Sequence, residues 1–145
     1  MSGLLKSIGD IWEDSEDLCD LIPFDRVFVG LVPTTEEYKM PYVSLITSGA
    51  RRRYRTDKTD GSTLTVSFHI WVDDADLDRG ESTAKQVRET YANHDWTFTG
   101  GTVIDVLDEG PFTTHQVNQP NYRAWEVMKV LTFCVEMPRV DQSSN

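Results

Sequence analysis

Residues 62–72, with the sequence STLTVSFHIWV, decide the fold of this chain. From Leu64 onward every second residue is an aliphatic or Phe side chain, and the residues between them are Thr, Ser, His or Trp. Because successive side chains of a strand point to opposite faces, this alternation predicts one long β-strand with one buried face. The preceding Asp60-Gly61 is typical of a turn. We therefore expect a hairpin that joins this strand to residues 42–47, with residues 51–58 at its far end.

The flanking sequence supplies two helices and four further strands. Apolar residues at helical spacing predict an amphipathic helix over residues 3–20, ended by Pro23, and a second helix over residues 78–93. Runs rich in β-branched and aromatic residues predict strands at 26–32, 102–107, 112–117 and 122–136. The order helix, three strands, helix, three strands predicts an α+β fold: an antiparallel sheet or sandwich with two helices packed on one side.

One domain accounts for the length of the chain, because 145 residues with 39% hydrophobic content are enough for one core. We expect residues 1–137 to form this domain and residues 138–145 to form a disordered tail. The longest apolar run, residues 27–32, is far shorter than the roughly 18 residues that a membrane helix needs. Cys19 and Cys134 are expected to be unpaired thiols in a reducing compartment.

The charges are unevenly distributed along the chain. It carries 14 basic and 24 acidic side chains, a net charge of −10. This excludes a protein that coats DNA through a generally basic surface, and it argues against adhesion to anionic membranes. Residues 1–25 carry a net charge of −6, and the acids on the first predicted helix are Asp10, Glu13, Asp14, Glu16, Asp17 and Asp20. Residues 51–58 carry a net charge of +4, from Arg51, Arg52, Arg53, Arg55 and Lys58 against one acid.

This separation of charge makes the molecule polarised. Both regions could be solvated faces, or the basic hairpin end could meet an acidic neighbour or a phosphate backbone. A contact between the two regions of identical subunits would favour a head-to-tail ring. Large aromatic side chains predicted near sheet edges also suggest an interface, and these are Trp71, Trp96 and Phe98. A second sheet that covers Trp71 is the alternative.

Known catalytic and metal-binding patterns do not fit the sequence. Asp74, Asp76 and Asp78 match the first oxygen positions of a calcium loop, but Arg79 stands where the turn glycine belongs and Lys85 where the glutamate belongs. The three histidines lack metal-ligand spacing, and neither a nucleophile elbow nor a phosphate loop occurs. We therefore expect no metal, no cofactor and no enzymatic activity.

Several short motifs resemble, in their order, those of bacteriophage tail-terminator or tail-completion (head–tail joining) proteins. Val27-Phe28, Val32-Pro33 and Pro41-Tyr42-Val43 are similar to the opening of that family. The segment from Thr59-Asp60-Gly61 to Trp71 resembles its central strand, and Val103-Ile104-Asp105 and residues 127–135 resemble its last strands. The resemblance covers roughly residues 24–136 and implies an α+β subunit that forms a ring, commonly hexameric, at the head-proximal end of a phage tail.

The same resemblance implies the function and the partners. The ring would end polymerisation of the tail tube and join the tail to the head connector. Its partners would be further copies of itself, the tail-tube protein and the head–tail connector protein. Genomic DNA would pass through the lumen without sequence-specific binding, and no membrane would be involved. The protein would be assembled in the host cytoplasm and reside in the virion, at the head–tail interface.

Two other functions remain open at this point: a head-side connector or stopper ring, and a monomeric acidic module that binds one protein partner. Residues 51–55 are more basic than the resemblance leads us to expect. The basic hairpin end could therefore contact a sibling subunit, DNA or the tape-measure protein.

Overall fold

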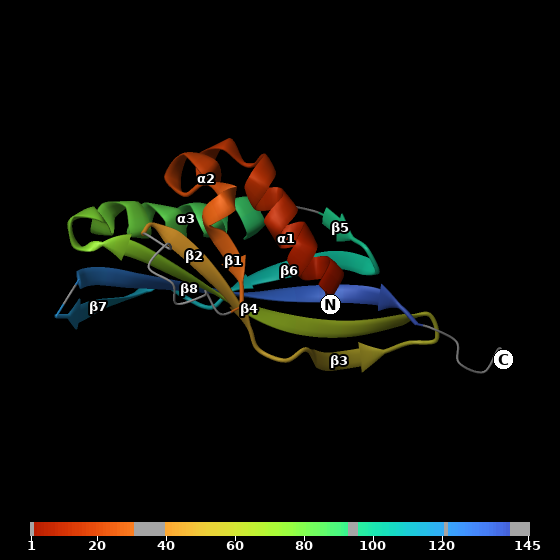
Figure 1. The fold of residues 1–145 in the computed structure, drawn as a ribbon. Coiled ribbons are helices and arrows are strands. Elements are labelled where there is room, and N and C mark those ends of the chain that lie inside the picture. The colour runs from red at the N-terminus through yellow and green to blue at the C-terminus, as the bar shows by residue number, and fades with distance from the viewer. Residues whose placement is uncertain (1, 31–39, 93–95, 121, 140–145) are drawn as a thin grey trace.

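The computed structural model describes residues 2–30, 40–92, 96–120 and 122–139, in which helices cover one face of an eight-stranded sheet (Figure 1). The predicted α+β class is confirmed, and every strand of the described chain belongs to this one sheet, so that it is not a sandwich. The helices are α1 (Ser2–Asp14), α2 (Glu16–Leu21) and α3 (Leu77–Ala92), with short 3₁₀ helices η1 (Phe24–Arg26) and η2 (Asp74–Asp76). The strands are β1 (Val27–Val29), β2 (Tyr42–Thr47), β3 (Arg51–Arg55), β4 (Thr59–Asp73), β5 (Trp96–Phe98), β6 (Gly101–Asp108), β7 (Thr113–Gln119) and β8 (Tyr122–Pro138).

Two long antiparallel strands, β4 and β8, form the centre of the sheet. β4 pairs with β8 over its whole length, from Thr59 opposite Pro138 to Asp73 opposite Ala124. Strands β2 and β3 both pair with β4, and β6 and β7 both pair with β8. Each of these pairs is antiparallel, whereas β1 runs parallel to β2, so the sheet is mixed. The strand order is β1-β2-β4-β8-β6-β5.

The core lies between the sheet and the helices, and the alternation in β4 places it there. The five apolar residues of β4 that define the pattern are buried: Leu64, Val66, Phe68, Ile70 and Val72. Opposite them α3 buries Ala84, Val87 and Tyr91. Gly80 lets α3 approach closely, because a Cβ there would lie 2.8 Å from Cγ2 of Val127.

Tyr91 connects α3 to both the sheet and α1. Its ring centroid lies 5.6 Å from that of Phe68 and 6.1 Å from that of Phe133, both on the sheet. Its hydroxyl donates a hydrogen bond of 2.6 Å to the carbonyl oxygen of Ile8 in α1. Burial raises the pKa of the Tyr91 hydroxyl far above its ordinary value, so that the group stays a donor. One side chain of α3 therefore fixes α1 relative to the sheet.

A buried lysine lies on the helix-covered face of β8. Lys129 Nζ donates to the Asp108 carboxylate and, at 2.6 Å, to the carbonyl oxygen of Gly110. On the other side of Asp108, Arg88 Nε of α3 lies 2.8 Å from Oδ2. Desolvation pulls the pKa of Asp108 upward, but the hydrogen bond and charge of Lys129, the amide of Gly110 and the charge of Arg88 outweigh it, and the pKa is lowered. The carboxylate therefore compensates an otherwise isolated buried charge.

The first predicted helix is interrupted. Residues 3–20 form two helices, because Ser15 Oγ accepts a hydrogen bond of 3.2 Å from the amide of Leu18 and caps α2.

The first strand is shorter than expected, since Arg26 belongs to η1 and β1 ends at Val29. Residues 31–32 of that prediction lie outside the described residues.

The boundaries around the hairpin also differ from the prediction. Residues 51–55 form strand β3, and Asp60-Gly61, expected as a turn, lies within β4. The chain reverses between Thr56 and Thr59, where Thr56 Oγ1 accepts a hydrogen bond of 2.9 Å from the amide of Thr59. At the other end of the sheet, β8 extends to Pro138. Residues 140–145 of the expected tail lie outside the described residues.

Substitution of Tyr91 by Phe tests the connection between α3 and α1. Tyr91→Phe keeps the ring but leaves the buried carbonyl of Ile8 without its donor, which lowers the free energy of unfolding by about 1–3 kcal/mol. Urea denaturation followed by tryptophan fluorescence measures this loss. An unchanged midpoint would show that the hydroxyl does not hold α1.

The Asp108→Asn variant tests the buried charge. At pH 7 it should lower the free energy of unfolding by about 2 kcal/mol, because it leaves the buried charge of Lys129 without a carboxylate. Solvent around the partly exposed Asp108 screens the pair and keeps the loss from being larger. Since the pKa of Asp108 is lowered in the folded state, its contribution is complete above its ordinary value near 3.8 and disappears as the pH falls through the lowered value.

Urea titrations of wild type and Asp108→Asn should therefore converge below pH 3.8. Asp57→Asn removes an exposed turn carboxylate and is the control, and its free energy of unfolding at pH 7 should match that of wild type. A gap between wild type and Asp108→Asn that is independent of pH would refute the assignment.

Candidate assembly interface

The predicted basic residues lie on the β3–β4 hairpin, at an edge of the sheet (Figure 1). Strand β3 pairs with β4 on one side, from Arg51 opposite Thr63 to Arg55 opposite Asp60. All five of its residues are exposed, as is Lys58 in the turn. Charged side chains are common on edge strands, because they prevent uncontrolled pairing with other chains. We call the cations gathered here the basic hairpin: Arg51, Arg52, Arg53, Arg55, Lys58 and Arg139.

A β-bulge shapes the basic hairpin. The register between β3 and β4 shifts between Arg52 and Tyr54, so that Arg53 is the extra residue. Desolvation raises the pKa of the buried Cys134 thiol of β8, and the charge of the nearby Arg53 partly offsets this rise. Tyr54 follows directly and pairs with Gly61. The bulge therefore brings two consecutive side chains of β3 toward β8.

Tyr54 anchors the hairpin to the centre of the sheet. Its ring lies against Gly61, where a Cβ would overlap ring atoms, and its hydroxyl donates a hydrogen bond to Glu136 Oε1 of β8. This hydrogen bond, desolvation and the charge of Glu136 raise the pKa of Tyr54. A glycine within a strand pattern is a signal of such close approach. The prediction of a turn at Gly61 is wrong, and no local pattern in the sequence predicts that Tyr54 and Glu136 meet there.

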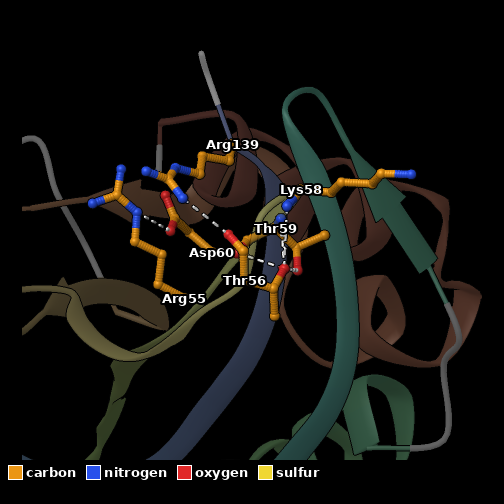
Figure 2. A network of polar contacts seen from close by, with 6 residues as sticks. All are labelled: Arg55, Thr56, Lys58, Thr59, Asp60 and Arg139. Carbon is orange, nitrogen blue, oxygen red and sulfur yellow. Dashed lines mark hydrogen bonds and ion pairs between the residues drawn. The ribbon is translucent and has the colours of Figure 1, made fainter. Parts of the chain in front are cut away.

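The turn of the hairpin is held by a polar network (Figure 2). Thr56 Oγ1 and Thr59 Oγ1 lie 2.7 Å apart. The backbone amide of Arg139 donates a hydrogen bond of 2.8 Å to the carbonyl oxygen of Lys58. The guanidinium of Arg139 donates a second hydrogen bond, of 3.3 Å, to the carbonyl oxygen of Thr56. The end of β8 thus adds a cation that is remote in sequence from β3. In Figure 2 the Lys58 side chain extends away from the other labelled residues.

The basic hairpin is poorly neutralised within the subunit. Of its six cations, Arg55 alone forms an ion pair with another described residue, with 3.5 Å between its Nε and Asp60 Oδ1. Arg51, Arg52 and Lys58 project into solvent without a carboxylate partner in the described chain. The hairpin therefore presents positive charge that is available to a partner.

The predicted acidic residues form a second exposed surface, on α1 and α2. We call it the acidic helix surface, and its members are all exposed: Asp10, Glu13, Asp14, Glu16, Asp17 and Asp20. Among them, Asp10 alone is paired with a cation of the described chain, at 3.2 Å from Lys6 Nζ. Figure 1 places α2 above the sheet and β3 at its lower edge, so the structure does not bring the two predicted surfaces together.

The three predicted interface aromatics have different positions. Trp96 and Phe98 are 7% and 8% exposed, so the expectation that they lie on the surface is wrong. They belong to β5, a strand that the sequence analysis did not predict, and they join the core, with Trp96 5.8 Å from Phe133 between ring centroids. Trp71 is half-buried and stacks on Tyr42, with 6.2 Å between ring centroids. Trp71 thus retains only part of its surface for a partner.

Neither a metal site nor a membrane helix is seen in the described part of the chain. No three His, Cys, Asp or Glu side chains among these residues gather closely enough to hold an ion. None of the described helices is long and apolar enough to cross a membrane. The two charged surfaces can bind a partner through ion pairs and hydrogen bonds.

The Gly61→Ala variant tests the Tyr54 anchor. The added methyl group displaces the ring and breaks the hydrogen bond to Glu136, and overpacking of this kind lowers the free energy of unfolding by about 1–3 kcal/mol. In a double-mutant cycle with Tyr54→Ala, the cost of Gly61→Ala should fall, because the ring is gone. Chemical denaturation of the four proteins measures the coupling, and additive effects would contradict the anchor.

Comparison with known proteins gives a likeness in fold. The chain matches no protein-family model. No curated protein matches it either. Its fold is similar to that of a chain in the solved structure of the virion of a native gene transfer agent particle, with a TM-score of 0.68 and 14% sequence identity. The match covers 93% of this chain and 96% of that chain, so the two share one fold over nearly their whole lengths.

Proposed function

We propose that this chain is a structural protein of a phage-like virion. The observation that carries the proposal is the fold likeness to a component of a gene transfer agent virion, which extends over 93% of this chain and 96% of the other. The role we propose is in virion assembly and not in catalysis.

Within such a virion, we infer that the chain forms a ring at the head-proximal end of the tail. The ring ends polymerisation of the tail tube and joins the tail to the head connector, with a hexamer as the expected stoichiometry. Two features support this role: the order of motifs resembling tail-terminator proteins and the two separate, poorly neutralised charged surfaces. The net charge of −10 suits a lumen through which DNA passes without adhering.

Native mass spectrometry and electron microscopy of the purified chain, alone and with tail-tube protein, test the proposal. We expect rings, either free or at one end of each tube. A species that stays monomeric in both conditions would contradict ring formation and favour a module that binds one protein partner.

Deletion of the gene from the virus that encodes it distinguishes the two ring functions. Tails of uncontrolled length are the result expected of a terminator. Tails of normal length that fail to join heads would instead assign the chain to a head-side connector or stopper ring. Wild-type virions would exclude both functions.

A further inference from the structure

The two charged surfaces of this subunit are complementary to each other. The basic hairpin has one internal ion pair, between Arg55 and Asp60, and the acidic helix surface has one, between Asp10 and Lys6. The remaining members of each surface are exposed and repel their neighbours of like sign. Unshielded clusters of one sign destabilise the isolated subunit, and an oppositely charged partner relieves that repulsion.

Geometry prevents this relief within one subunit. The acidic helix surface lies on the helix layer, whereas β3 lies at the lower edge of the sheet, and Figure 1 shows the two far apart. Both are parts of a single sheet-and-helix unit, in which Tyr91 holds α1 and the hairpin strand β4 pairs with β8. The surfaces can therefore meet only between molecules.

We propose that the basic hairpin of one subunit docks on the acidic helix surface of a second copy of this chain. Arginine guanidinium groups bind carboxylates with paired N–H donors, and Arg51 and Arg52 of the hairpin are both exposed. This proposal rests on the proposed ring-forming function and names the surfaces that make the ring.

The hairpin is built to dock without further ordering. Tyr54 is held on Gly61 and Glu136, and the turn is held by Thr56 and Arg139. A preorganised surface loses less conformational entropy on binding than a free loop does. The rigid anchor thus contributes to affinity although none of its members needs to touch the neighbour.

The contact joins two different surfaces, so it is heterologous. Each copy offers one hairpin and one acidic helix surface, and repetition of such a contact closes into a ring when the rotation between copies allows it. A nucleic acid as occupant would account for the basic hairpin alone. A second copy accounts for both surfaces at once, in a subunit whose net charge is −10.

Charge reversal tests this contact directly. The hairpin variant is Arg51→Glu/Arg52→Glu, at two cations without an ion pair in the described chain. The helix variant is Glu13→Lys/Asp14→Lys, at the C-terminal end of α1, where lysine suits the helix dipole and preserves the fold. Lys85→Glu/Arg123→Glu makes the same change in charge as the hairpin variant at other exposed sites and serves as its control.

Sedimentation velocity and native mass spectrometry at low ionic strength measure assembly, with circular dichroism as the check on folding. Each reversed variant alone should assemble with an apparent dissociation constant weakened by roughly 100-fold, because like charges then face each other. An equimolar mixture of the two variants, and the single chain with all four substitutions, should regain rings. The control should assemble like wild type.

The outcomes separate this contact from the proposed function. If both reversed variants form rings as wild type does, the contact is overturned and the ring function stands. The same conclusion follows if the reversed variants lose their rings and mixing them does not restore rings. A hairpin variant that forms normal rings but loses binding to a duplex DNA fragment would assign the hairpin to DNA instead. A wild-type chain that never forms rings, with or without tail tubes, would overturn both.

Discussion

The packing of Tyr91 between the sheet and α1 is the interaction on which the rest of the structure depends. Its ring contacts aromatic side chains of the two central strands, and its hydroxyl holds the backbone of α1 at Ile8. Because burial keeps this hydroxyl protonated, the link is a neutral hydrogen bond in a dry environment, where a lost partner is costly. The position of the acidic helix surface relative to the sheet follows from this one link.

The sheet extends this fixed geometry to the basic hairpin. Strand β4 pairs with β8 along its whole length, so the packing at one end of this strand pair also fixes the position of the other end. Tyr54, laid across Gly61 onto Glu136, then ties the edge strand β3 to both. The molecule thereby holds two oppositely charged surfaces apart at fixed positions. Rigid separation of charge favours contacts between subunits over contacts within one.

Several features could be predicted from the sequence because they depend on local periodicity. The alternation from Leu64 to Val72 identifies the central strand and its buried face, and the long final strand follows from the same period. The charged surfaces were also predicted, since charge runs such as Arg51–Arg53 stay exposed in a small domain. Lys129 lies on the otherwise apolar face of β8, and its partner Asp108 could not be predicted, because their pairing depends on the register of β6 against β8.

The sequence by itself determined the α+β class, the alternating core strand and the uneven distribution of charge, because each depends on side-chain direction or type within one segment. Only the tertiary structure decided that Trp96 and Phe98 are buried, that residues 51–55 form an edge strand, and that Arg139 joins the basic hairpin. These positions depend on partners far away along the chain. A three-residue strand such as β5 has no period of its own, and its burial is set by the helix and strand that pack against it.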